Sequence, residues 1–278
     1  MKQQVMNHSR VDTQSSGVEA VFQREIKQLA QKLFPRNTKK RQQVINRMLD
    51  YVNQALGKEV LIIVSPGGWG NTPIENLQEW EKSIVNGVTE ALSRLGHKWA
   101  LAQYLRSGPT IWGHLRDLGK EAPFFYFGKS PRAEAMAEQL KLLTRILPDI
   151  KILLLAVSQG AAFDNAAMKS ASDNPSIYSI ELGTFFPQMP RRTLSPRTLA
   201  IDNNGLQRDP MCERDLWAGT KSYIKAFSRW FRALAQGKNV KFTHCINTPG
   251  HEYEWEHPAV GSRIVTFLTT HFGWVQVK

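Results

Sequence analysis

The chain has 278 residues, 42% of them hydrophobic and 22% charged, which is enough for one large α/β domain and an extra segment. No stretch reaches the roughly 18 uninterrupted apolar residues that a membrane-spanning helix needs, and the polar N-terminus lacks the apolar run of a secretory signal. Two cysteines, Cys212 and Cys245, are too few for a disulfide framework and lack the spacing of metal ligands. We therefore expect a cytoplasmic protein that holds no metal.

The net charge of +12 comes from 36 Lys and Arg against 24 Asp and Glu. Such an excess can attract nucleic acid, an anionic membrane surface or an acidic substrate. The basic residues form an early cluster and a later one in a Pro-rich loop: Arg36, Lys39, Lys40 and Arg41, then Arg191, Arg192 and Arg197. No nucleic-acid-binding motif accompanies either cluster, so a solvated surface is the simpler interpretation. Peripheral binding to nucleic acid or to a membrane stays open, and the sequence does not indicate the oligomeric state.

Residues 1–17 are polar and are expected to form a disordered tail. Residues 18–57 are expected to form a helical extension of two amphipathic helices, the first stopped by Pro35 and the second by Gly57. We expect these helices to pack against the main domain, which is predicted to span residues 58–278.

From residue 58 onward, short apolar runs alternate with helical patterns. The runs predict about six strands, at 60–64, 99–105, 150–157, 177–182, 198–201 and 240–246. Helices are predicted between them, at 74–95, 131–147, 160–171, 216–234 and 258–272. This alternation is typical of a doubly wound, mostly parallel sheet flanked by helices. In such a sheet the functional residues lie in the loops at the carboxyl ends of the strands.

Ser158 follows the strongest predicted strand and precedes a helix of small residues. A serine on such a tight turn exposes its hydroxyl and faces the helix N-terminus. Gly160 and its alanine neighbours would allow the strand and the helix to approach closely. Ser158 is therefore the candidate nucleophile, with a helix N-cap as the alternative.

A glycine-rich loop, residues 66–70, follows the first strand. Backbone amides of Gly68 or Trp69, together with that of Gln159, are candidates for an oxyanion hole. A flexible turn with Trp69 as a packing residue is the alternative. The loop lacks the Gly-Lys-Ser/Thr ending and the third glycine of nucleotide-binding loops, so no cofactor is predicted.

His251 lies directly after the last predicted strand and is the candidate general base, with an unassigned surface histidine as the alternative. His257 competes with it but precedes a proline at the start of the closing helix, and the spacing of the two histidines does not fit a zinc-binding helix. A third residue should orient the histidine. Asp209, in a loop before a helix, is favoured over Asp202; two glutamates, Glu181 and Glu252, are weaker candidates.

The order glycine loop, Ser158, Asp209, His251 resembles that of the α/β-hydrolase superfamily over residues 59–272. Ala156 replaces the first glycine of the Gly-x-Ser-x-Gly motif, Pro66 stands where some members have histidine, and two helices replace the usual first strands. The resemblance implies acyl transfer from a small-molecule ester, thioester or amide to water. The aromatic loop at 111–127, with Phe185 and Phe186, would line an acyl pocket or belong to ordinary packing.

Two other functions remain open. One is a non-catalytic binding protein with the same fold, because folds host many unrelated functions. The other is a basic protein that binds nucleic acid or an anionic membrane surface peripherally, which would follow from the charge of +12.

Overall fold

The computed structural model describes residues 21–68, 70–106, 130–213, 225–226, 228–232, 235–237 and 248–273. Several predictions concern residues outside these ranges: the tail at 1–17, Trp69, the aromatic loop at 111–127, most of the helix at 216–234, and the strand at 240–246 with Cys245.

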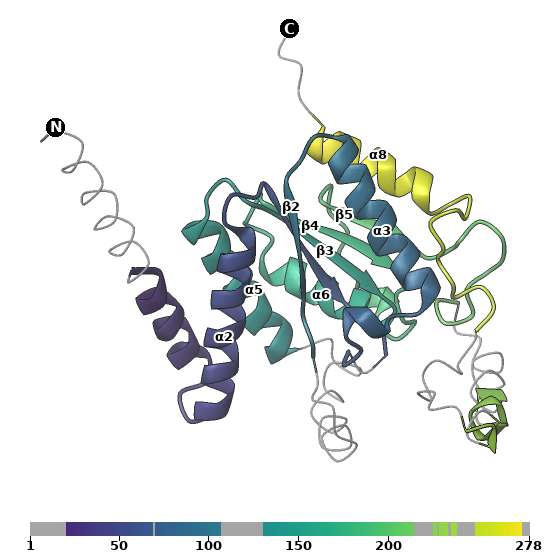
Figure 1. The fold of residues 1–278 in the computed structure, drawn as a ribbon, viewed down its shortest axis with the longest axis horizontal. Helices are drawn as coiled ribbons and strands as arrows, with labels where there is room; N and C mark the ends of the chain where they lie inside the picture. Colours follow the sequence, from purple (N-terminus) through teal and green to yellow (C-terminus); the bar gives the residue numbers. More distant parts are fainter. Residues whose placement is uncertain are drawn as a thin grey trace, which may run out of the picture.

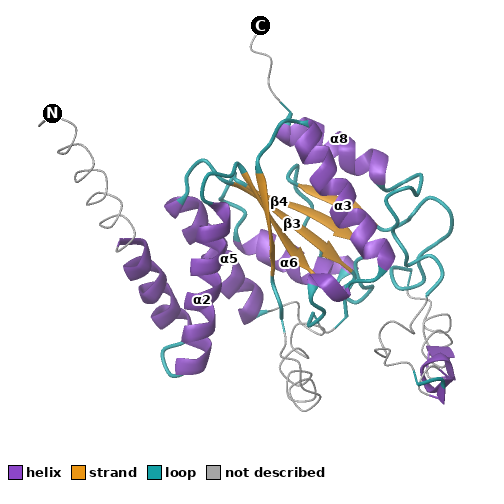
Figure 2. Ribbon diagram, viewed as in Figure 1, coloured by secondary structure: helices purple, strands orange, loops and turns teal. Residues whose placement is uncertain are grey.

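A sheet of five parallel strands lies at the centre of the molecule (Figures 1 and 2). The strands are β1 (Val60–Ser65), β2 (Trp99–Gln103), β3 (Lys151–Val157), β4 (Ile177–Leu182) and β5 (Thr198–Ile201). Their order is β2-β1-β3-β4-β5. All six residues of β1 are buried, as expected for a parallel strand covered on both faces.

Helices cover both faces of this sheet, so the predicted fold class is confirmed. One face carries α2 (Thr38–Ala55), α5 (Pro131–Ile146) and α6 (Gln159–Ser170), and the other carries α3 (Glu79–Arg94) and α8 (Gly261–Phe272). Successive residues of β1 alternate between the two cores, Leu61 joining the first and Ile62 the second. The two predicted N-terminal helices are present, at 21–33 and as α2.

Two helix starts differ from the prediction. The single helix predicted at 74–95 is a 3₁₀ turn (Ile74–Asn76) followed by α3, because Gln78 is extended and forms a capping box with Glu81. The helix predicted from residue 258 begins at Gly261, because a turn precedes it in which the Val260 amide donates to the His257 carbonyl. By contrast, α5 begins at Pro131 as predicted, capped by Ser130.

The strand order reverses between β1 and β3, which makes the carboxyl ends of these two strands the expected position of a site. The register places Ser65 beside Ala156, Ala156 beside Glu181, and Leu182 beside Ile201. The loops after β1, β3, β4 and β5 therefore emerge at one edge of the sheet.

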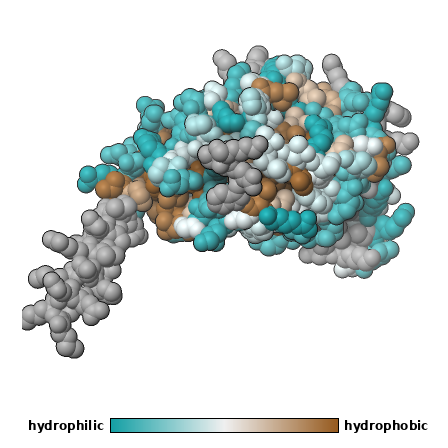
Figure 3. Space-filling model, turned by 90° about the horizontal axis from the view of Figure 1, so that it is seen from above, coloured by the Kyte–Doolittle hydropathy of each residue, from teal (hydrophilic) through white to brown (hydrophobic). Residues whose placement is uncertain are grey.

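In the part of the chain that the structure describes, no helix has the length and apolar character needed to cross a membrane. Hydrophilic and apolar residues are mixed on the face shown in Figure 3.

Candidate active site

Ser158 occupies a strained turn between β3 and α6. Its φ of 54° and ψ of −118° lie in a region that non-glycine residues rarely adopt, and it is the only non-glycine residue with positive φ among those described. Ser158 occupies the N-cap position of α6, as the alternative interpretation expected, but its hydroxyl makes no capping bond to the helix. A Cβ at Gly160 would lie 2.3 Å from the Ser65 carbonyl oxygen. The turn therefore requires a glycine two residues after the serine.

The glycine loop after β1 lies beside this serine. A Cβ built on Gly67 would come within 3.5 Å of Ser158 Cβ. Arg106 holds this loop in place. Its guanidinium donates to the carbonyl oxygens of Pro66 at 2.9 Å and Gly68 at 2.8 Å. Because a peptide group is planar and trans, a carbonyl turned toward the arginine directs the Gly67 amide the opposite way.

The structure describes two of the three residues whose amides are expected to form an oxyanion hole. Gly68 has a φ of +53°, which suits a glycine. Gln159 is the first residue of α6, and the first amides of a helix have no partner within it. Trp69 lies outside the described residues, so its amide stays a prediction.

Asp209 is fully buried and accepts hydrogen bonds on both carboxylate oxygens. His251 Nδ1 lies 2.7 Å from Oδ2, the Tyr253 hydroxyl donates to the same oxygen at 2.5 Å, and the Cys212 thiol donates to it at 3.2 Å. The Met211 amide donates to Oδ1 at 2.8 Å. The carboxylate is thus held in one orientation, with the imidazole as its most exposed partner.

The pKa of Asp209 reflects two opposing effects. Burial acts to raise it, but the hydrogen bonds from His251, Tyr253 and Cys212 outweigh burial and hold it below the usual range. Burial also raises the pKa values of the Tyr253 hydroxyl and the Cys212 thiol. Both groups therefore stay protonated at neutral pH and act as donors to the carboxylate.

The loop that carries His251 is fixed at several points. Gly250, with a φ of +92°, lies against the backbone of Arg208 and Asp209. The Asn204 side chain donates to the carbonyl oxygen of Glu252 at 2.9 Å. These contacts bring the histidine loop to the aspartate, although 42 residues separate His251 from Asp209.

Gly183, the residue after β4, connects the serine to the histidine. The Ser158 amide donates to the carbonyl oxygen of Leu182 at 2.7 Å, directly before this glycine. A Cβ at Gly183 would lie 2.7 Å from the Tyr253 ring, 2.9 Å from His251 Cε1 and 3.0 Å from Asp209 Oδ2. Ser158 and His251 therefore lie near the same peptide group at the carboxyl edge of the sheet.

No hydrogen bond joins the Ser158 hydroxyl to the His251 ring in the described part of the chain. Because His251 Nδ1 is bonded to Asp209, Nε2 is the nitrogen left to accept a proton. Catalytic hydrogen bonds are often long in ligand-free enzymes and shorten when substrate binds.

The other candidate acids have different partners. Asp202 receives a bond of 2.6 Å from Arg192 and a longer one from the Thr184 amide, and Arg192 also donates to Glu181 at 2.9 Å. Arg192 had been expected in a solvated basic cluster, but its side chain is only 6% exposed because it fills the space between these two carboxylates. His257 pairs with Glu254. The structure thus brings His251 to Asp209 and not to Asp202.

Glu81, the capping residue of α3, is a further carboxyl group close to the site. It lies beside a small apolar pocket lined by Val64, Leu77, Ile84 and Val157, under the ends of β1 and β3. Burial raises the pKa of Glu81, and the nearby His251 acts against that rise. The sequence analysis assigned it no role.

No family model matches this sequence, and no curated protein is similar to it. Among solved structures, the fold is similar to that of a Trichoderma reesei cutinase in complex with a phosphonate inhibitor. The similarity is one of fold. It covers 88% of this chain and 98% of that chain, with a TM-score of 0.43 and 13% sequence identity.

Sequence reasoning missed several residues around the site: Tyr253, Cys212, Gly183 and Arg106. Tyr253 lies two residues after His251, and both side chains bond to Oδ2 of Asp209. That spacing could have identified Tyr253, and the glycine directly after a strand could have identified Gly183. Nothing local indicates that Arg106 lies against the glycine loop.

Proposed function

We propose that this protein is a serine hydrolase that acts on an ester, thioester or related acyl substrate. Ser158 would be the nucleophile, His251 the general base and Asp209 the residue that orients the histidine. The observation that carries the proposal is the 2.7 Å bond between Asp209 and His251, at the edge of the sheet where Ser158 occupies its strained turn.

The proposed reaction has two stages. Ser158 Oγ attacks the substrate carbonyl while His251 Nε2 takes the hydroxyl proton, and the same nitrogen then gives that proton to the leaving group. Water attacks the resulting acyl-enzyme with His251 again as base, which releases the acid and restores the serine. Asp209 fixes the tautomer in which Nδ1 carries the proton and stabilises the charged imidazole.

The amides of Gly68 or Trp69 and of Gln159 would stabilise the negative oxygen that develops during both stages. Removing one such donor typically costs about 3 kcal/mol of transition-state stabilisation. Arg106 holds the loop that carries these amides, because it binds the carbonyl oxygens of Pro66 and Gly68.

Tyr253 and Cys212 are positioning residues in this proposal. Their donors share Oδ2 of Asp209 with His251 and balance the cost of burying the carboxylate. Among the described residues no arginine bonds to Asp209, and the imidazole of His251 is the partner that the proposed mechanism uses as base.

The test is hydrolysis of a series of p-nitrophenyl acyl esters by the full chain. We expect turnover that Ser158→Ala and His251→Ala each reduce by at least about 1,000-fold. Ser170→Ala, which removes an exposed hydroxyl at the other end of α6, is the matched control and should leave the rate unchanged.

Labelling with a fluorophosphonate distinguishes the hydrolase from a non-catalytic protein of the same fold. Stoichiometric labelling at Ser158 that His251→Ala suppresses would support the proposal. Wild-type turnover in Ser158→Ala, or no labelling and no turnover with any ester, would contradict it and leave the binding protein as the better account.

A further inference from the structure

Half of the net charge of this protein is concentrated in its N-terminal helical hairpin. We call residues 21–57, the helix at 21–33 with α2, the basic hairpin. It contains eight Lys and Arg residues against two acidic ones, a net charge of +6 out of +12 for the chain. Figure 1 shows the two helices side by side at one end of the molecule.

The apolar side of the basic hairpin is already used for packing. Ile26, Ala30 and Met48 are fully buried in the core shared with α5 and α6. The Tyr51 hydroxyl donates to the carbonyl oxygen of Gln103 at 3.0 Å, which ties α2 to the edge strand β2. The hairpin therefore presents only its polar side to the outside, on a fixed framework.

Some of the basic residues are occupied by contacts within the protein. Arg47 lies over the Tyr104 ring and donates to Gln139 at 2.7 Å, and Lys32 lies 3.5 Å from Glu138. Arg41 donates to Gln31 and Thr38.

Four other cations of the hairpin are exposed and form no ion pair with a described carboxylate: Arg24, Lys27, Arg36 and Lys39. They lie on the first helix, on the turn between the helices and at the start of α2. Their charge is therefore not compensated within the described structure.

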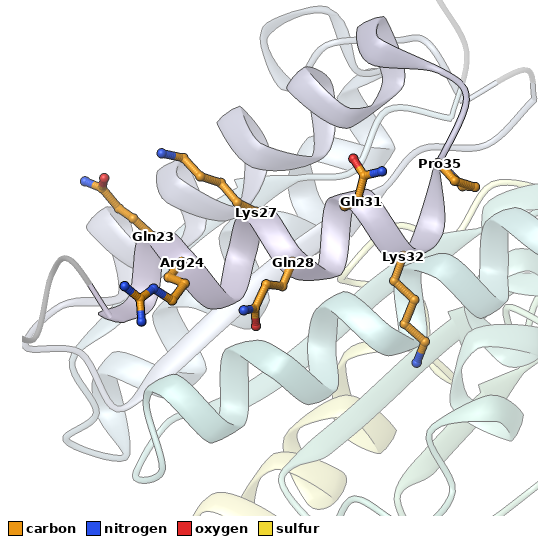
Figure 4. A pocket seen from close by; sticks show the side chains of 7 residues that line it. All are labelled: Gln23, Arg24, Lys27, Gln28, Gln31, Lys32 and Pro35. Carbon is orange, nitrogen blue, oxygen red and sulfur yellow. The ribbon is translucent and has the colours of Figure 1, made fainter.

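Glutamines lie between the cations of the first helix. Gln23, Gln28 and Gln31 share a surface groove with Arg24, Lys27 and Lys32 (Figure 4). The helix rises about 1.5 Å per residue, so Arg24, Lys27 and Lys32 place positive charge along about 12 Å of its length. Glutamine amides donate hydrogen bonds to phosphate and sugar oxygens, as arginine and lysine do.

We infer that the basic hairpin binds nucleic acid through its phosphate backbone, without reading sequence. A membrane surface fits less well, because a helix that lies in a membrane inserts a free apolar face, and here that face is buried in the core. The large apolar side chains exposed on the hairpin, Val21 and Leu56, lie at its ends and form no such face. The inference does not depend on the proposed hydrolase activity.

The test uses fluorescence anisotropy of a labelled 20-nucleotide single strand and a 20-base-pair duplex with the full chain. Four phosphate contacts predict a fall in affinity of about 100-fold between 50 and 200 mM salt. A variant with Arg24→Gln, Lys27→Gln, Arg36→Gln and Lys39→Gln should lose at least about 30-fold in affinity at 50 mM salt and most of the salt dependence. These side chains are exposed, so the variant should melt at nearly the wild-type temperature.

The matched control removes the same charge elsewhere: Lys98→Gln, Arg145→Gln, Lys169→Gln and Arg263→Gln, all exposed and outside the hairpin. This control should retain wild-type affinity within about threefold, because the affinity should depend on direct contacts between the hairpin and phosphates and not on the net charge of the protein. Ser158→Ala should also bind as wild type.

Several outcomes would overturn the inference. They are absence of binding at 50 mM salt, equal losses in the hairpin and control variants, and affinity that does not change with salt. Binding to vesicles with 30% phosphatidylserine but not to either nucleic acid would also overturn it and assign the hairpin to a membrane.

Discussion

Two carboxylate clusters lie at neighbouring strand ends, and they differ in the groups that face the carboxylates. Asp209 is surrounded by neutral donors and by His251, whose side chain is 16% exposed. Glu181 and Asp202 share the guanidinium of Arg192, which holds its proton at any physiological pH. Only the first cluster pairs its carboxylate with an imidazole, which the proposed mechanism needs as its base.

The two clusters also differ in the direction of their pKa shifts. Hydrogen bonds lower the pKa of Asp209 despite its burial, whereas burial raises the pKa of Glu181 even though Arg192, Asn165 and Ser179 act against the rise. The environment of Asp209 therefore stabilises its anion. At Glu181 the hydrogen bonds and Arg192 do not fully offset the cost of burying the charge.

The largest expected effect separates the two aspartates. Asp209→Asn should lower kcat/KM by about 10,000-fold, because the amide no longer favours the tautomer that leaves Nε2 free to accept a proton. Asp202→Asn, which removes a partner of Arg192, should change kcat/KM by less than about tenfold and act on stability instead. Ester hydrolysis and urea unfolding of both variants measure these effects. Equal losses of activity would remove the distinction between the clusters.

The next largest effect is on the free energy of unfolding and concerns the ion pair between Arg192 and Glu181. Arg192→Met should lower the free energy of unfolding by about 3–5 kcal/mol, because it leaves the buried Glu181 carboxylate without its cation. The double variant with Glu181→Gln should recover part of that loss, since the remaining group is neutral. Urea titration of the two variants tests this, and a loss below about 1 kcal/mol for Arg192→Met would show that the ion pair matters little.

The opposite pKa shifts predict opposite pH dependences of stability. Because the pKa of Glu181 is raised, its contribution is complete below about pH 4.3 and is lost as pH rises through the folded-state pKa. Because the pKa of Asp209 is lowered, its contribution is present above about pH 3.9 and is lost as pH falls through the folded-state pKa. Each pKa unit corresponds to about a tenfold change in the folding equilibrium.

Unfolding titrations between pH 3 and 8 can therefore separate the two groups. Relative to wild type, Glu181→Gln should gain stability as pH rises, and Asp209→Asn should lose it. Parallel pH profiles for the two variants would contradict the assigned directions.

A smaller loss of activity than that of Asp209→Asn is expected at the positioning residue Tyr253. Tyr253→Phe should lower kcat by about tenfold with little change in KM, because Asp209 loses one donor. The pKa of Asp209 should rise, so activity should be lost at a higher pH on the acid side. Tyr51→Phe, which removes another buried hydroxyl far from the site, is the control and should leave both constants and the pH profile unchanged.

Much of the fold could be predicted because its signals are local. The strands β4 and β5 have the bounds expected from their apolar runs, and Pro131 marks the start of α5. The break before α3 could not be seen, because it depends on the reciprocal hydrogen bonds of Gln78 and Glu81. Chain order and loop position were sufficient to favour Asp209 over Asp202.

The rest of the site depends on contacts between distant segments. The sequence placed Arg192 in a charged, Pro-rich loop, which is typical of a surface, and nothing local shows that two carboxylates enclose it. Tyr253 likewise reaches Asp209 only because two separate loops meet beside Gly183, whereas Cys212 contacts Asp209 within one turn of the same loop.

In the proposed hydrolase, the backbone of Ser158 would set the stability of the fold against the reactivity of its nucleophile. Glycine would tolerate a φ of 54° without the penalty that a side chain incurs, so Ser158→Gly should raise the free energy of unfolding by up to about 1 kcal/mol. A selection for heat resistance alone would thus favour loss of the hydroxyl, and only a demand for turnover would retain it.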